Sequence, residues 1–430
     1  MDSLLCSALT YTWGSTVNRY RTILLFSILL LLASCTPVLP GAEPNDGTPL
    51  ETSTPMPDPL DTPPVLEQRP ADRSLLSSQE PPPRGAEREF ATDFGRHTVS
   101  YAEVLSGGPP KDGIPAIDQP RFVSIQEADV WLEANEPVVL VEIGDEARAY
   151  PIQILMWHEI VNDTLGGVPI AVTFCPLCNT AIAFERLVGD SQETTFGTTG
   201  RLRYSNLIMY DRLTETWWQQ ATGEGLAGEH AGATLKTVPA TIVAWESFQA
   251  VHPDGDVLSR ETGFSRSYGV NPYRGYDDVN ESPFLFRGPP TPGELPAMAR
   301  VLTVDRGEEA VAYPFEELAQ ERVVNDTVAD LPVVVFWQEG TASALDSGVI
   351  AEGRDVGAAS AFSRVLDGQT LSFHLDGGSF VDEQTGSEWT VLGRATSGPL
   401  SGRELTPVVS INHFWFSWAA FRPETRIYTC

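Results

Sequence analysis

Residues 147–186 read ARAYPIQILMWHEIVNDTLGGVPIAVTFCPLCNTAIAFER, and residues 310–337 repeat much of that order as AVAYPFEELAQERVVNDTVADLPVVVFW. Both stretches have Tyr-Pro near the start, and both have the tetrad Val-Asn-Asp-Thr at the same distance after it, at 161–164 and 324–327. Each tetrad is followed by an apolar, β-branched run. The shared order indicates two versions of one structural unit.

The correspondence continues in the same order beyond these stretches. The matched residues are Asp211, Thr214 and Trp218 with Asp382, Thr385 and Trp389, and Trp245, Phe248 and Pro253 with Trp415, Trp418 and Pro423. An ordered series of this kind is typical of an internal duplication. We therefore expect residues of about 137–258 and 298–428 to form superposable lobes with approximate two-fold pseudo-symmetry.

Differences between the two copies separate scaffold from chemistry. The first copy alone has Trp157, His158, Glu159, Cys175, Pro176 and Cys178, and the second has Gln320, Glu321 and Arg322 in the place of the first three. The first copy also has extra residues around GTTGRLRYSN, which include Arg203, Ser205 and Asn206. We predict a site at Cys175, Cys178 and His158, shielded by Trp157 and lined by these three extra residues.

Each lobe is predicted to be α+β and strand-rich. Short β-branched or alternating runs bounded by turn residues predict strands at 137–143, 167–174 and 179–186. Helical spacing after a proline predicts a helix at 151–160, and two further helices are expected at 244–252 and 414–421. Asn162 and Asp163 are expected to cap the first helix and start a turn.

The N-terminus resembles a bacterial lipoprotein signal. Arg19 and Arg21 precede the apolar run TILLFSILLLL, which ends at Leu-Ala-Ser-Cys with the cysteine at 35. The run is shorter than the roughly 20 residues that a membrane span requires. We expect residues 1–34 to be a signal peptide and Cys35 to be lipidated. The mature protein is then extracytoplasmic and lipid-anchored to the cell membrane or the outer membrane.

Composition divides the rest of the chain. Residues 35–88 are rich in Pro, Thr, Glu and Asp and predict a disordered tether. The expected domains are a first lobe at 89–258, an inter-lobe connection at 259–297 and a second, degenerate lobe at 298–430. The formal net charge of −30 argues against nucleic acid and against a basic lipid-binding face, so the expected membrane contact is the lipid anchor.

The CPLC motif admits a redox interpretation. Paired cysteines outside the cytoplasm are usually structural disulfides, but a bridge from Cys175 to Cys178 closes a loop too small to constrain the unfolded chain much. A redox dithiol is the sharper hypothesis, because backbone N–H groups at the end of the strand would lower a thiol pKa. The motif does not open a helix as that of thioredoxin does, since NTAIAFER alternates like a strand.

Two other functions stay open. Two thiolates from a tight turn also resemble one knuckle of a metal site, with His158 as a third ligand. Cu(I) would suit the motif with Met156 or Met209 nearby, and zinc would suit it with His230 or His252. The third hypothesis is a surface protein without enzymatic activity, whose lobes serve a partner.

Several motifs in order resemble a known family. They are WHEIVND, TFCPLCNTA, LIMYDRLTETWWQ and SYGVNPYRGYD. Together they resemble the family catalogued as domain of unknown function 3179, and the resemblance covers the chain from about residue 95 to its end. It implies a fold and an extracytoplasmic setting but no particular reaction. The second copy departs from the CPLC pattern.

Overall fold

The computed structural model of the protein describes residues 75–76 and 80–430. The predicted signal peptide, the predicted lipidation site Cys35 and most of the predicted tether lie outside the described residues. Within the described part, no helix has the length and apolar character needed to cross a membrane.

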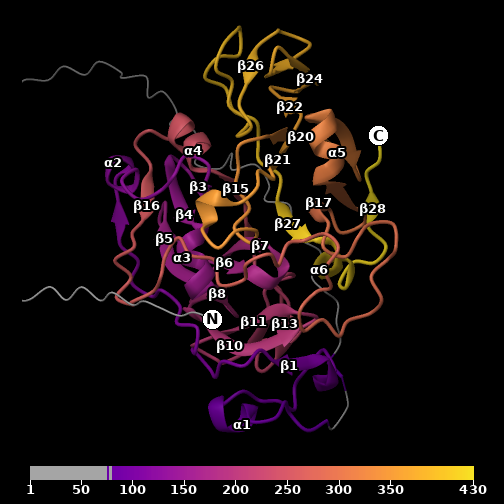
Figure 1. The fold of residues 1–430 in the computed structure, drawn as a ribbon. Helices are drawn as coiled ribbons and strands as arrows, with labels where there is room; N and C mark the ends of the chain where they lie inside the picture. The colour runs from indigo at the N-terminus through magenta and orange to yellow at the C-terminus, as the bar shows by residue number, and fades with distance from the viewer. Residues whose placement is uncertain (1–74, 77–79) are drawn as a thin grey trace, which may run out of the picture. The chain divides into compact units, whose positions relative to one another are not determined.

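Strands dominate the described part of the chain, and its helices are short (Figure 1). The helices are α1 (Ala86–Glu89), α2 (Ile125–Ala128), α3 (Ile152–His158), α4 (Trp245–Val251), α5 (Phe315–Glu321) and α6 (Trp415–Ala419). The three helices expected from sequence are present as α3, α4 and α6. Helix α3 begins directly after Pro151, whose fixed φ suits the start of a helix. The strand-rich α+β class is therefore confirmed.

One sheet of each half has the same order over four strands, and the sheet of the first half has β2 as a fifth strand at its edge. The first is β15 (Ala240–Ala244), β3 (Pro137–Ile143), β4 (Glu146–Pro151), β16 (Asp256–Leu258) and β2 (Phe122–Val123). The second is β27 (Ser410–Phe414), β17 (Arg300–Asp305), β18 (Ala310–Pro314) and β28 (Arg426–Ile427). In both, the first three strands are antiparallel neighbours, and the pairs β4–β16 and β18–β28 are parallel.

A second sheet in each half carries the apolar runs. The first is β14 (Thr237–Val238), β7 (Thr180–Glu185), β6 (Val168–Cys175) and β5 (Ile160–Leu165), and the other is β19 (Val323–Val328), β20 (Leu331–Gln338) and β21 (Ala358–Ser363). Helix α3 lies beside β6, so the helix and the CPLC strand are neighbours, as their order in the chain suggested.

The remaining strands form a five-stranded sheet, a three-stranded sheet and two hairpins. They are β1 (Val104–Ser106), β10 (Phe196–Arg203), β11 (Asn206–Asp211), β12 (Trp217–Gln219) and β13 (Gly225–Ala227) in one sheet, β24 (Phe373–Asp376), β25 (Ser379–Asp382) and β26 (Glu388–Trp389) in another, and the hairpins β8 (Leu187–Val188) with β9 (Gln192–Glu193) and β22 (Val365–Leu366) with β23 (Gln369–Thr370). The hairpin of β10 and β11 reaches the CPLC motif.

Asn162 and Asp163 are strand residues, so the predicted helix cap is wrong. Helix α3 ends at His158, and both residues lie in β5. The Tyr150 hydroxyl donates to Asp163 Oδ2 at 2.6 Å, and the Asn162 amide exchanges two hydrogen bonds with the Phe196 backbone. Buried partners from distant strands satisfy side chains that would otherwise favour a turn.

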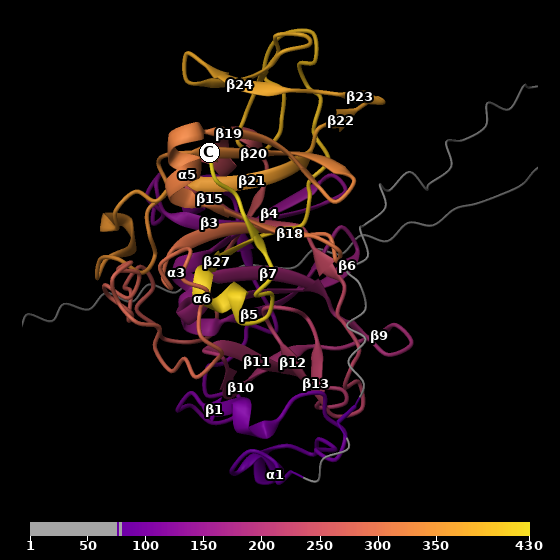
Figure 2. The same ribbon diagram turned by 90° about the vertical axis from the view of Figure 1, so that its right-hand side faces the viewer.

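The two halves share one apolar core. Val172 and Phe174 of β6 belong to the same buried cluster as Phe414 and Phe416 from the end of the chain. Strand β27 lies against both β7 and β15, and the turned view shows β27 beside β7 (Figure 2). The second half therefore contributes directly to the surroundings of the CPLC motif.

Candidate functional site

A strand and a tight turn deliver the two cysteines to one point. Strand β6 ends at Cys175, a single 3-10 turn covers Pro176–Cys178, and Asn179 takes a left-handed φ of 50° before β7 begins. Cys175 is 2% exposed and Cys178 is fully buried. Their sulfurs are 3.1 Å apart and both cysteines are free. A disulfide needs about 2.05 Å between the sulfurs, so a small shift closes the bond.

Two of the predicted lining residues contact the sulfurs. The Cys178 thiol points at the Ser205 carbonyl oxygen, 3.4 Å away, and Asn206 Nδ2 donates to Cys178 Sγ at 3.2 Å. Tyr204 and Ser205 form the two-residue loop between β10 and β11, with φ of 53° and 66°. Residues other than Gly and Asn are strained at such angles, and strain of this kind clusters at functional sites.

Arg203 and Trp157 have other contacts. Arg203 Nε donates to Glu103 at 2.6 Å, and its guanidinium lies over the ring of Tyr204. Trp157 packs on the core cluster that includes Phe174. Arg203 and Trp157 therefore contact neighbouring side chains, and neither forms a hydrogen bond with the sulfur of Cys175 or Cys178.

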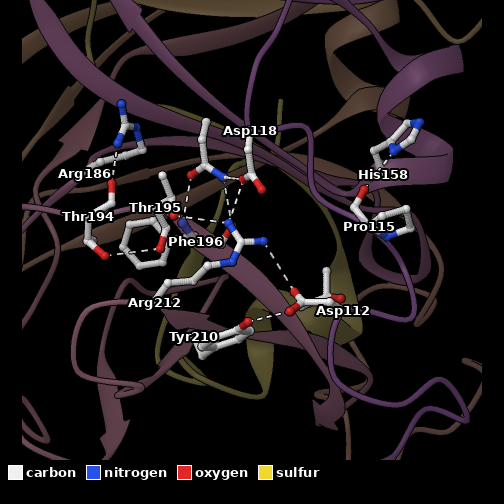
Figure 3. A network of polar contacts seen from close by, with 12 residues as sticks. Asp112, Pro115, Asp118, His158, Arg186, Thr194, Thr195, Phe196, Tyr210 and Arg212 are labelled. Carbon is white, nitrogen blue, oxygen red and sulfur yellow. Dashed lines mark hydrogen bonds and ion pairs between the residues drawn. The ribbon is translucent and has the colours of Figure 1, made fainter. Parts of the chain in front are cut away.

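His158 is occupied away from the sulfurs. Nδ1 donates to the Pro115 carbonyl oxygen at 2.7 Å, a bond drawn in Figure 3, and Nε2 accepts from the Tyr268 hydroxyl at 2.7 Å. Burial lowers the pKa of His158, which favours this neutral form. Among residues 80–430, no group of three or more His, Cys, Asp or Glu side chains is placed to hold a metal ion. The predicted set of two cysteines and His158 is therefore not gathered as ligands.

Glu159 is a member of the site that the sequence prediction passed over. It follows α3 with a φ of 58°, its backbone carbonyl accepts from Phe174 N at 2.8 Å, and only 8% of the residue is exposed. Burial raises the pKa of Glu159 to about 8. Its charge acts on Cys175 and on Tyr273. The sequence signal was present, since Glu159 is one of the residues that only the first copy has.

The segment expected to be a simple connection covers the cysteines. The Tyr276 hydroxyl donates to the Leu177 carbonyl oxygen at 3.0 Å and accepts from Phe284 N at 3.2 Å. The Ser205 hydroxyl donates to the Phe284 carbonyl oxygen. The Tyr-rich composition of residues 267–277 was the signal for this role. The segment closes the dithiol from solvent.

Burial has a larger effect on the pKa of the Cys175 thiol than backbone N–H groups have. Burial raises the pKa of this thiol well above its ordinary value, and the bond to Cys178 and the nearby charges of Cys178 and Glu159 raise it further. The Leu207 amide acts in the opposite direction and does not compensate. The expected lowering of the thiol pKa is therefore wrong at Cys175. A proton acceptor is needed to form its thiolate near neutral pH.

A polar network from three distant parts of the chain lies behind the sulfurs. Gln220 Nε2 donates to Thr173 Oγ1 at 2.9 Å and to the Thr180 carbonyl oxygen at 3.2 Å. Thr180 Oγ1 lies 2.8 Å from Nδ1 of His413, a residue of β27. Burial lowers the pKa of His413 to about 3, so its ring is neutral. Sequence comparison missed Gln220, although the second copy lacks the Gln-Gln pair that follows Trp218.

A second network keeps the hairpin in register with the CPLC sheet (Figure 3). Asp118 accepts from Asn162 Nδ2 of β5 at 2.7 Å and from Arg212 Nη1 at 2.6 Å. Arg212 directly follows β11, and Tyr210 of that strand donates to Asp112 at 2.5 Å. The network fixes β11 against β5, and with it the turn that presents Ser205 and Asn206.

The chain belongs to the protein family of unknown function DUF3179, whose model matches residues 111–425. The matched range contains the CPLC turn, Glu159, the covering tyrosines and His413. No curated protein and no solved structure matches the chain significantly.

Proposed function

We propose that Cys175 and Cys178 form a reversible dithiol–disulfide couple and that the protein exchanges disulfides with a thiol or disulfide partner. The observation that carries the proposal is the 3.1 Å separation of two free, buried sulfurs at the end of one strand. In the reaction, two cysteine thiols and one partner disulfide give the Cys175–Cys178 disulfide and two partner thiols. The partner disulfide is the oxidant, and the couple carries two electrons.

The surroundings of the sulfurs favour disulfide exchange over a purely structural role for the two cysteines. Asn206 donates to one sulfur, and the Ser205 carbonyl oxygen faces both, at 3.9 Å from Cys175 and 3.4 Å from Cys178. These groups position both sulfurs through hydrogen bonds, which leave the sulfurs able to form a covalent bond. The covering tyrosines would have to move for a partner to enter, so exchange is expected to be gated by residues 259–297.

The couple is expected to titrate in redox buffers. The full chain is equilibrated with glutathione buffers of increasing oxidation, and free thiols are trapped with an alkylating agent and located by mass spectrometry. Cys175 and Cys178 should lose and regain their thiols together. Cys175→Ser should leave Cys178 without its partner, and Cys178→Ser should do the same to Cys175. Cys430→Ser is the matched control, because Cys430 is exposed and bonds to Glu317 instead. Alkylation that is independent of the buffer would contradict the proposal.

We infer that the mature chain is a lipoprotein attached through Cys35, which sets the couple outside the cytoplasm. The support is the Leu-Ala-Ser-Cys order after a short apolar run. Cys35→Ala should release the protein from the membrane fraction, because the lipid chain is lost. Cys6→Ala is the control and should stay in the membrane fraction. Membrane retention of the Cys35→Ala protein would overturn the anchor.

We also infer that the two halves arose by duplication and are related by an approximate two-fold axis. The support is the common strand order and a set of matched hydrogen bonds. Tyr150 donates to Asp163 as Tyr313 does to Asp326, and Glu159 and Arg322 both take a left-handed φ after the helix. On this account the second copy kept the scaffold and has no counterpart of the dithiol.

A further inference from the structure

The Glu159 side chain is buried close to the CPLC strand. It makes no hydrogen bond or ion pair with the described part of the chain, although only 8% of the residue is exposed. Burying an unpaired carboxyl group is costly, and the cost is largest for its charged form. A fold that needed only a helix end at this position would gain stability from a neutral residue. The buried acid therefore suggests a chemical role.

Glu159 is held next to the dithiol by backbone bonds on both sides. Its N–H donates to the Leu155 carbonyl oxygen at 2.7 Å, and its carbonyl oxygen accepts from the N–H of Phe174, the residue before Cys175. The second half has Arg322 at the matching place, which is paired with Glu339 at 3.2 Å near the surface. The buried acid and the dithiol thus occur together in one half and are both missing from the other.

We propose that Glu159 is the proton acceptor for the Cys175 thiol during disulfide exchange. The inference rests on the proposed function of the dithiol. The Glu159 carboxylate takes the proton from Cys175, and the Cys175 sulfur then bonds to one sulfur of the partner disulfide while the other sulfur leaves. Glu159 returns the proton to that leaving thiolate. The Cys178 sulfur next displaces the second partner thiolate from Cys175, and the Cys178 proton passes to it.

Few other titratable groups face this carboxyl group. They are the Cys175 thiol and the Tyr273 hydroxyl, with Cys178 and Tyr276 beyond them. The neighbouring His158 is turned toward Pro115 and Tyr268 and is neutral. Burial raises the pKa of both Tyr273 and Tyr276, so neither competes for the proton near neutral pH. The pKa of Glu159, about 8, suits a group that gives and takes a proton in this range.

Glu159→Gln keeps the shape of the side chain and removes its titration, and it defines the test. The rate of Cys175–Cys178 disulfide formation by oxidised glutathione is measured from pH 6 to pH 10 on the full chain. The native protein should show a rise with an apparent pKa near 8. The Gln variant should lack this rise and react about 100-fold more slowly at pH 8, a typical contribution of a positioned base. Glu159→Asp should keep the rise and recover part of the rate.

A stability measurement separates failure of this inference from failure of the proposed function. The folded state holds the Glu159 proton up to about pH 8, whereas the unfolded chain releases it near pH 4.5. As the pH rises between these two values, the unfolding free energy of the native protein should therefore fall relative to that of Glu159→Gln. If the disulfide forms but both proteins share one pH–rate profile, the role of Glu159 is wrong and the couple stands. If no disulfide forms, the proposed function fails while the stability difference still reports the buried acid.

Discussion

Asp277→Asn is expected to cost about 3–5 kcal/mol of unfolding free energy, because it leaves a buried arginine without its counter-charge. The Asp277 side chain is fully buried and accepts from Arg300 Nη2 at 2.6 Å and from Arg354 Nη1 at 2.8 Å. These bonds fasten the covering segment to the second half of the chain. Urea unfolding measures the loss. Alkylation of Cys175 and Cys178 in the folded variant should also become faster as the cover loosens.

Asp278→Asn is the matched control for this prediction. Asp278 is exposed, and among the described residues its side chain bonds only to Asn280, so its replacement should change stability by less than about 0.5 kcal/mol. Burial raises the pKa of Asp277, but Arg300, Ser343 and Arg354 outweigh burial and leave that pKa lowered. The native protein should thus lose this stabilisation as the pH falls below about 4, and the Asn variant should lack that acid-dependent contribution. Equal stability of the two variants at neutral pH would contradict the claim that Asp277 fastens the covering segment to the second half of the chain.

Asp211→Ala and Asp382→Ala are expected to destabilise the protein by similar amounts, about 3 kcal/mol each. Each substitution leaves a buried indole N–H and a backbone N–H without an acceptor. Asp211 accepts from Trp218 Nε1 at 2.9 Å and from Thr214 N at 2.7 Å. Asp382 accepts from Trp389 Nε1 at 3.0 Å and from Thr385 N at 2.6 Å. Thermal or urea unfolding of both variants measures the losses.

This pair tests the inferred duplication. Glu383→Ala changes an exposed carboxylate next to Asp382 and should leave stability almost unchanged. A large loss at one aspartate with none at the other would mean that the two positions do different work, and the equivalence of the halves would fail with it.

Local patterns predicted the strands and short helices, but not the partners that complete the site. Alternating or β-branched runs correctly marked β3, β6 and β7, because these patterns report burial on a pleated surface. Asn162 and Asp163 were assigned to a turn because their distant partners, the Phe196 backbone and Tyr150, are invisible in a local window. The same limit hid His413, which reaches Thr180 from the other half of the chain.

Comparison of the two copies predicted part of the site. It selected both cysteines, Ser205 and Asn206, which the structure brings together. It also suggested Arg203 and His158, whose side chains bond elsewhere, because a difference between copies does not say where a side chain points. Glu159 was within the selected differences, yet its importance depends on burial of a lone carboxyl group, and only the folded structure reveals that burial.

Peptide mapping of the oxidised protein tests the central claim most directly. The folded full chain is treated with excess oxidised glutathione, free thiols are blocked, and the peptide that contains residues 175–178 is analysed by mass spectrometry. Our account predicts a peptide lighter by two hydrogen atoms, with no blocking group, which returns to two blockable thiols after reduction. A peptide that keeps both thiols under these conditions, while Cys430 is oxidised, would contradict the dithiol couple.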